Sequence, residues 1–532
     1  MGIVIDLTVD FSRITQDQWT AVYEETLQLI EQYPFMEKIV DRDSYDETMI
    51  YADRTKERYL SPWYPDKLGW FSIGDLGSFE HTETFLLFRD INYYKDIDVP
   101  QRDGDIYFSL IDRHGTPMPE ITALSTGGYQ VFDGKTQGYD SHKYLLGIAA
   151  LIEDRLKPHA VVSGDITRAQ IQESVDWVNQ FLETPISLPD RCNCSRLLER
   201  IKRWVPQESV QIEMLFFLLL YPENNELGTF IRENFSREII RDYWKNYFKN
   251  VQPNTLGIHE VVGSYLDMHF PIDDLCTILV AEDSTTRLTP RECIREILDS
   301  GIMEQQPESW LSPNNQSDPE PETIPSLFGK SYLAMAGFRD STRQHMDEPQ
   351  LKHIFYSVFQ DTRLVDEVFE EYKPQGEPQS SGNIRKEFAE EFLSRFSENT
   401  DPLHQVQYDI EEPEEIMHWK EGDSLHPDLT KKVQTVLDLS DSTIEELQRK
   451  YGEKNKNARI KALLRHNRYF LIRKETWDFI LSNILDDTIY LRFLSLLSIE
   501  ANEKRLNIVL KYICNNLNFL IHQMLIPIGN NK

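Results

Sequence analysis

Acidic and histidine side chains gather in the first quarter of the chain, beside short apolar runs that have the composition of strands. Glu80 and His81 precede one such run, and Asp105 and His114 flank another. Carboxylates and imidazoles that meet in one cleft can hold a divalent metal and activate water, which is the chemistry of a metal-dependent hydrolase. Asp beside Gly is also ordinary turn chemistry. Both interpretations stay open, and the turn residues favour surface acids.

The five cysteines offer a weaker metal pattern. A single residue separates Cys192 from Cys194, whereas a structural zinc site is usually built from Cys-x-x-Cys knuckles, in which two residues stand between the cysteines. Cys276 and Cys293 stand alone and do not supply the missing knuckle. An odd number of cysteines in a long chain also argues against a disulfide scaffold and for a reducing compartment. We therefore predict no metal site.

Two other patterns are incomplete. Glu415 and His418 have the Glu-x-x-His spacing of di-iron helices, but a second copy, which such a site needs, does not occur. Ser163-Gly164-Asp165 precedes a predicted helix but lacks the glycine density and the lysine of a P-loop, so Asp165 or Thr167 is expected to cap that helix. Esterase, dinucleotide-binding, kinase and zinc-protease motifs do not occur. We predict no catalytic residue and no cofactor, although an enzyme is not excluded.

A basic segment stands out in an otherwise acidic chain. Residues 449–474 hold ten Lys or Arg and one acid, Glu453, while the whole chain carries a net charge of −32. A local cluster of positive charge is the electrostatic footprint of a polyanion site. The alternative is that this segment docks on acidic residues of the same chain, such as those in 409–415.

The spacing of apolar residues around this segment predicts three helices and a hairpin. The helices are expected over 430–437, 443–451 and 455–466, with a break at the capping residues 438–442. Period two and aromatic content favour strands over 469–472 and 476–479.

Three short helices followed by a hairpin, with the basic charge on the third helix and the hairpin, resemble the winged helix-turn-helix family over residues 425–480. In that family the third helix enters the DNA major groove and the hairpin touches the backbone. The polar stretch 451–455 is long for the family's tight turn. The resemblance implies nucleic-acid contacts for eight residues, which are Lys456, Asn457, Arg459, Lys461, Arg465, Arg468, Arg473 and Lys474. Many winged helices instead contact proteins, so a protein partner stays open.

The N-terminal part predicts an antiparallel α+β domain. A helix is expected from Thr15 through Ile30, and residues 3–9 alternate like an edge strand. Short strands separated by Gly and Asp turns are more typical of an antiparallel sheet than of a doubly wound one. These strands are predicted over 49–51, 70–73, 84–88, 106–111 and 128–132.

The whole chain is expected to be an α+β multidomain protein. Residues 158–205 resemble segments of uncharacterised bacterial proteins, a resemblance that implies no function. The expected units are an α+β domain (1–205), a helical domain (206–302), a Pro-rich acidic linker (303–329), a helical segment (330–400), a winged helix-turn-helix (425–482) and C-terminal helices (483–532).

Composition limits the function classes. No uncharged apolar run has membrane-spanning length, and the N-terminus lacks a basic flank, so we expect a cytoplasmic protein without a membrane partner. The leading hypothesis is a non-catalytic recruitment or regulatory protein whose C-terminal winged helix contacts nucleic acid or a protein partner. Its acidic body would contact other proteins, and any DNA contact would be made by residues 449–474. The alternatives are the hydrolase described above and an acidic interaction or immunity-type protein.

Overall fold

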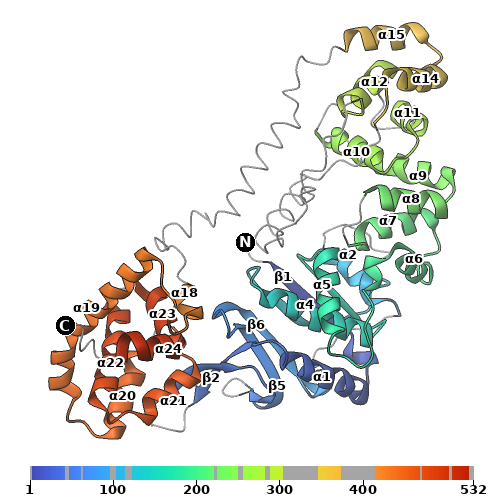
Figure 1. Cartoon of the computed structure of the whole chain (residues 1–532). Coiled ribbons are helices and arrows are strands. Elements are labelled where there is room, and N and C mark those ends of the chain that lie inside the picture. The colour runs from blue at the N-terminus through green and yellow to red at the C-terminus, as the bar shows by residue number, and fades with distance from the viewer. Residues whose placement is uncertain are drawn as a thin grey trace.

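The computed structural model describes most of the chain (Figure 1). The predicted linker 303–329 lies outside the described residues except for Met303, and only 345–372 of the predicted segment 330–400 is described. The described residues are 3–41, 47–60, 64–95, 103–113, 123–220, 224–249, 256–281, 288–303, 345–372, 414–467, 470–502 and 506–525.

A three-stranded antiparallel sheet lies at the centre of the N-terminal unit, which we call the α+β body. β1 (Val4–Val9) lies between β7 (Tyr129–Lys135) and β8 (Ala160–Gly164). The covering helices are α1 (Gln16–Ile30), α4 (Ser141–Arg155) and α5 (Arg168–Val178). Helix α4 contacts the sheet, and the other two helices contact α4, so one apolar core joins all these elements.

The prediction that residues 3–9 form an edge strand is wrong, because β1 is paired on both sides. Leu7 faces Phe132 of β7 and Val162 of β8. The polar residue Asp6 is partly exposed and accepts a hydrogen bond from the side chain of Gln130 at 3.0 Å. The alternation therefore reports the two faces of the sheet and not the position of the strand within it.

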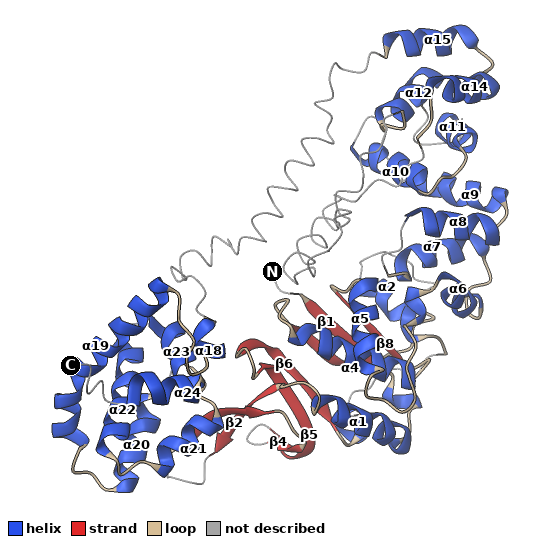
Figure 2. Ribbon diagram, viewed as in Figure 1, coloured by secondary structure: helices blue, strands red, loops and turns tan. Residues whose placement is uncertain are grey.

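Two more antiparallel sheets complete the strands of the body, as predicted for this fold class (Figure 2). They contain β2 (Met36–Asp41) with β3 (Met49–Arg54), and β4 (Arg58–Leu60), β5 (Tyr64–Asp75) and β6 (Glu80–Phe88). The predicted strand over 106–111 is wrong. Asp105 accepts a hydrogen bond from the backbone of Tyr107 at 2.9 Å, and this cap starts the short helices η3 (Ile106–Phe108) and α2 (Ser109–Arg113).

The next part of the chain forms an arm of short helices that extends away from the body (Figure 1). Along one row α7, α9, α11 and α14 contact one another in order, and along the other row α8, α10, α12 and α15 do the same. Such stacking is typical of helical solenoids, in which neighbouring units bury each other's apolar sides. The helices are α6 (Cys194–Lys202), α7 (Glu208–Leu218), α8 (Asn224–Asn234), α9 (Arg237–Phe248), α10 (Leu256–Asp267), α11 (Ile272–Val280), α12 (Pro290–Asp299), α14 (Glu348–Phe359) and α15 (Thr362–Glu371).

The C-terminal unit is a helical domain on the other side of the body (Figure 1). Its central helix α22 contacts α19, α20, α21 and α23. The elements are α18 (Glu415–His418), α19 (Pro427–Tyr451), α20 (Lys456–His466), α21 (Lys474–Ser482), α22 (Asp487–Asn502), α23 (Asn507–Asn515), α24 (Leu517–Phe519) and η6 (Leu520–Leu525).

The predicted break over 438–442 is wrong, because α19 runs through it as one helix. Ser440, which looked like a capping residue, is buried against Ser495 of α22, and their hydroxyls share a hydrogen bond. Arg492 of α22 pairs with Asp441 at 2.6 Å. These contacts satisfy the polar side chains within the helix, so they do not end it.

The predicted strand over 476–479 is also wrong, because these residues lie in α21. Thr476, Trp477 and Ile480 are buried, a spacing that places them on one face of a helix. The preceding residue Ile472 accepts a hydrogen bond from the backbone of Ala52 in β3 at 2.9 Å. The chain here contacts the body and forms no hairpin within the described residues.

The C-terminal domain shares its core with the body. Met36, Met49, Ala52 and Phe79 of the body are buried in the same apolar cluster as Trp477 of α21. The fold is thus mixed α+β with several units, and these two are joined by burial. None of the described helices combines the length and the apolar character needed to cross a lipid bilayer.

Candidate functional site

Arg459, which the resemblance places at DNA, lies inside the C-terminal domain with 5% of its surface exposed. Its guanidinium donates hydrogen bonds to the backbone carbonyls of Gly452, of Lys454 at 3.0 Å and of Ile484 at 3.2 Å. It also pairs with Asp487 at 2.6 Å. This arginine fastens the turn between α19 and α20 to the start of α22, so it does not face a ligand.

Two further cations of the predicted site contact the α+β body. Arg465 donates to the Glu47 carboxylate at 2.5 and 2.8 Å. Arg473 is largely buried and donates to the carbonyl oxygens of Leu76 and of Gly77, the latter at 3.1 Å. These two side chains therefore dock on the same chain, which is the alternative to a polyanion site. They dock on the β2–β3 and β5–β6 turns and not on the acidic residues 409–415 that the sequence suggested.

The other predicted residues differ in exposure. Lys474 pairs with Asp478 on its own helix at 2.5 Å, and Lys461 is partly buried. Lys456 and Asn457 are exposed in the first turn of α20. Arg468 lies outside the described residues.

What remains of the basic segment is a compact corner between α19 and α20. Arg449, Lys450, Lys454 and Lys456 are exposed, and none of them forms an ion pair with another described residue. The start of α20, capped by Asn455, adds the partial positive charge of a helix N-terminus. We call these four cations the basic corner. It presents exposed cationic side chains, which suit a phosphate backbone or a carboxylate surface.

The three described residues of the predicted hydrolase site, Glu80, His81 and Asp105, lie in different parts of the body. Glu80 and His81 begin β6 beside the C-terminal domain, and the pKa of Glu80 is raised to about 7 by burial and by the nearby carboxylates of Asp140 and Asp75. Asp105 is bound to Arg200 of the arm through two hydrogen bonds of 2.7 Å. His114 lies outside the described residues. The structure therefore does not bring Asp105 to Glu80.

A buried polar network that the sequence did not indicate joins the arm to the body. The Arg200 guanidinium lies 3.5 Å from the ring centre of Tyr107 and donates to the Pro158 carbonyl at 3.0 Å. The Tyr107 hydroxyl donates to Glu153, whose other oxygen accepts from the backbone of Val162 at 2.7 Å. Burial raises the pKa of Glu153, and these hydrogen bonds oppose that rise. Because these polar groups are hydrogen-bonded to one another, the network holds the arm helix α6 against the body and does not present a group to a substrate.

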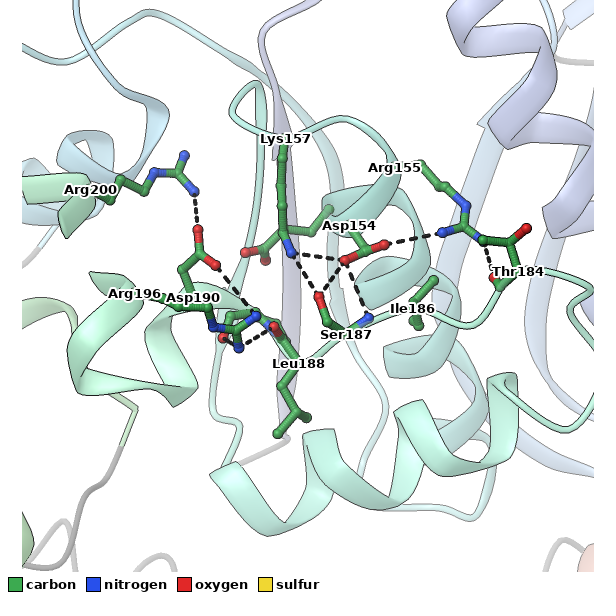
Figure 3. Close-up of polar contacts among 12 residues, drawn as sticks. Asp154, Arg155, Lys157, Thr184, Ile186, Ser187, Leu188, Asp190, Arg196 and Arg200 are labelled. Carbon is green, nitrogen blue, oxygen red and sulfur yellow. Dashed lines mark hydrogen bonds and ion pairs between the residues drawn. The ribbon is translucent and has the colours of Figure 1, made fainter. Parts of the chain in front are cut away.

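A serine and a lysine meet on the surface nearby (Figure 3). Lys157 donates to the Ser187 hydroxyl at 3.1 Å and to the Asp154 carboxylate at 2.8 Å, and Ser187 donates to the same carboxylate at 2.8 Å. A Ser-Lys pair can act as a nucleophile with its base. Here the Ser187 hydroxyl directs its proton at the Asp154 carboxylate, and Lys157 donates to the serine oxygen, so the geometry is not that of a nucleophile facing its base. The cluster fastens the extended segment around Ser187 to the end of α4.

A shallow polar groove of about 420 Å³ lies between α5, the start of α6 and α8. Arg168 pairs with Glu226 at 3.2 Å in this groove, and Cys192 and Cys194 contribute to its lining. Burial raises the pKa of Cys192 to about 11 and also raises the pKa of Cys194. Both thiols therefore stay protonated, which disfavours a thiolate nucleophile or a metal ligand.

The remaining sequence patterns have structural roles. Thr167 caps α5, as expected, and the Asp165 carboxylate accepts a hydrogen bond from the backbone of Val4 at 3.1 Å. Glu415 accepts from the backbone of His426 at 2.7 Å, while His418 is exposed. Within the described part of the chain, no three His, Cys, Asp or Glu side chains are grouped as a metal ion would require.

The buried His142 side chain is expected to make the stability of the fold sensitive to acid. This side chain is buried, and burial lowers its pKa from 6.5 to about 4. The unfolded chain binds a proton at His142 more readily than the folded chain does. The stability contributed by the neutral His142 is therefore complete above pH 6.5 and declines by roughly 3 kcal/mol as the pH falls toward 4. We expect His142→Gln to remove that part of the decline in urea denaturation between pH 6.5 and 4. An unchanged decline would contradict the assignment, and His418→Gln is the exposed control.

Comparisons of the chain with protein-family models, with curated proteins and with solved structures give no match. The assignment of function therefore depends on the geometry of this chain alone, and the resemblance to winged helix-turn-helix proteins stays a prediction.

Proposed function

We propose that this chain is a recruitment protein that holds nucleic acid at the basic corner between α19 and α20. The proposal is supported by a difference among the cations of residues 449–474, some of which bind other groups of the protein while others are exposed. Arg459 and Arg473 are used inside the protein, and Arg465 is paired with Glu47 at the surface. By contrast, Arg449 and Lys454 belong to a group of cations that stay exposed and without ion pairs among the described residues. Exposed, unpaired Lys and Arg next to one another are what phosphate contacts require.

The small number of cations in the basic corner limits how nucleic acid can be bound. The rest of the chain is strongly acidic and repels a polyanion, so contact is confined to this corner. Point-charge contacts to phosphates carry no sequence information. We therefore assign the corner a sequence-independent, salt-sensitive interaction that brings the rest of the protein to nucleic acid.

The salt dependence of DNA binding tests this assignment. Four phosphate contacts predict that the logarithm of the binding constant falls with the logarithm of salt concentration with a slope of about −3.6, whereas ten contacts would give about −9. We expect the full chain to bind random duplex DNA with the smaller slope. Fluorescence anisotropy of labelled DNA across a salt series measures it. The full chain is needed because the C-terminal core includes residues of the body.

Matched variants decide which cations act. Replacing all four cations of the corner by Ala is expected to abolish binding, whereas replacing Lys431 and Lys474, which already pair with carboxylates at 2.6 and 2.5 Å, leaves it unchanged. Equal loss in both variants would show diffuse charge and would contradict the proposal. Binding to poly-glutamate but not to DNA would assign the corner to an acidic protein instead.

A further inference from the structure

An exposed apolar side chain lies beside the basic corner. Leu485, in the turn between α21 and α22, has 67% of its surface exposed, more than any other large apolar side chain in the described part of the chain. The turn itself is fixed, because Ile484 is buried in the C-terminal core and the backbone of Asp486 donates to the Asn483 carbonyl at 2.9 Å. Leu485 is therefore an apolar side chain that stands in solvent on a firm support.

Arg459 joins this turn to the basic corner. Its guanidinium donates to the backbone carbonyls of Gly452, of Lys454 at 3.0 Å and of Ile484 at 3.2 Å. Lys454 is one of the four cations of the corner, and Leu485 directly follows Ile484. Because one planar group binds all three carbonyls, the backbone of Leu485 lies next to that of Lys454. The exposed leucine and the exposed cations are thus neighbours.

The two acids that follow Leu485 are held by other groups. Asp487 pairs with Arg459 at 2.6 Å. Asp486 accepts a hydrogen bond from the backbone of Thr488 at 2.9 Å, where the start of α22 adds partial positive charge. Neither carboxylate is therefore an unopposed charge beside the leucine.

The basic corner has only a small excess of positive charge. Glu453 lies among its four cations, and Glu445 and Glu446 are exposed one turn before them on α19. Phosphate contacts alone therefore give weak binding, and an apolar contact adds stabilisation that salt does not screen. Within the described part of the C-terminal domain, Leu485 is the one large apolar side chain that is exposed. A single side chain suits the gap between two bases, whereas a lipid surface needs a wide apolar face.

We propose that Leu485 is a wedge that enters between neighbouring bases of the nucleic acid held at the basic corner, and that the chain therefore prefers DNA with an unstacked site. Leucine is among the side chains that proteins insert at base steps, where they unstack the bases and kink the duplex. Unstacking costs least where bases are already mismatched or unpaired. This role rests on the proposed function, because the cations have to hold the backbone for the wedge to act.

A preference for distorted DNA tests the wedge. Two short fluorescein-labelled duplexes, which differ only in a central unpaired bulge, are compared by anisotropy with the full chain. We expect the bulged duplex to bind about 5- to 10-fold more tightly. Leu485→Ala is expected to reduce that ratio to less than about twofold and to change binding of the intact duplex little, whereas Leu485→Phe retains the ratio. Leu485 is exposed, so these variants are expected to fold.

A base analogue reports the insertion directly. 2-Aminopurine beside the bulge brightens when it is unstacked, so its fluorescence is expected to rise with the native chain and not with Leu485→Ala. Tyr59→Ala, which truncates an exposed aromatic side chain of the body, is the control and is expected to keep both the ratio and the rise.

Every other outcome overturns the wedge. Equal weakening of both duplexes by Leu485→Ala would mean that the leucine only shapes the corner. Equal, salt-sensitive binding of both duplexes by the native chain would leave the basic corner intact and remove the wedge. No binding of either duplex would remove the proposed function as well, so the two failures are distinguishable. Binding to phosphatidylglycerol vesicles that Leu485→Ala abolishes, without a preference for the bulge, would assign the leucine to a lipid surface.

Discussion

Replacing Asp105 by Ala is expected to lower the free energy of unfolding of the α+β body by about 3 kcal/mol, because it removes the nearer of the two carboxylates that pair with the buried Arg200 guanidinium. Only Asp190, at 3.3 Å, then remains as its counter-charge. The side chains of Asp105 and Arg200 are 4% and 7% exposed, and two hydrogen bonds of 2.7 Å join them. Asp105 also accepts from the backbone of Tyr107, so the variant loses the cap of η3 as well. Urea denaturation followed by tryptophan fluorescence measures the loss.

Two controls separate burial of charge from mere loss of an ion pair. Glu199→Ala breaks the exposed pair with Lys202 on the same helix, 3.2 Å long, and is expected to cost less than about 0.5 kcal/mol. Arg200→Met combined with Asp105→Ala removes both charges and is expected to recover much of the stability. If Asp105→Ala cost no more than Glu199→Ala, the network would not hold the arm to the body.

Local patterns in the sequence were sufficient for the elements that are fixed by near neighbours. The helix expected from Thr15 begins with a capping box, in which the Thr15 side chain accepts from the backbone of Gln18 and the Gln18 side chain accepts from the backbone of Thr15. Antiparallel pairing was also correctly predicted, because Gly and Asp turns separate consecutive strands.

The same patterns could not show contacts between distant segments. The two neighbours that make β1 a central strand come from residues 129–135 and 160–164. The carbonyl groups that bind Arg473 lie almost 400 positions earlier in the chain. A basic run looks the same in sequence whether its cations face solvent or dock on the protein, so residues 449–474 could be identified as a charged segment but not divided into bound and exposed side chains.

Some missed residues left a signal that could have been used. Glu153 follows the apolar run 145–152 of α4, and Arg200 lies among Leu197, Leu198 and Ile201 on α6. A charged residue on an apolar helix face needs a buried partner. That reasoning predicts a partner for each residue but does not name it. By contrast, Lys157 and Ser187 are 30 residues apart and carry no pattern that joins them.

The arm and the C-terminal domain are both joined to the body by apolar burial. Ile106, Ile111 and Val161 of the body are buried in the same apolar cluster as Leu215 of α7, just as Phe79 is buried in the core of the C-terminal domain. Arg200 adds charge and hydrogen bonds at the junction with the arm. The basic corner thus belongs to a domain whose core is shared with the body.

Phe79→Ala is expected to destabilise the C-terminal domain by about 3–5 kcal/mol, although the residue lies on the turn between β5 and β6. Its ring is fully buried in the C-terminal core, with the Arg473 guanidinium 5.8 Å and the Lys511 ammonium 5.6 Å from the ring centre. Hydrogen exchange of the α22 amides measures the effect. Tyr59→Ala, which truncates a 64% exposed aromatic side chain of the body, is the control and is expected to leave exchange unchanged.

The backbone of Phe79 gives this prediction a second test. Its φ angle of 63° lies in the left-handed region, which costs a side-chain-bearing residue about 1–2 kcal/mol and costs glycine little. Phe79→Gly loses the same ring as Phe79→Ala but relieves the backbone, so we expect it to be the more stable of the two by about 1 kcal/mol. If neither variant changed exchange in α22, the C-terminal domain would be stable without the body. DNA binding at the basic corner could then be measured on that domain alone, whereas the shared core requires the full chain.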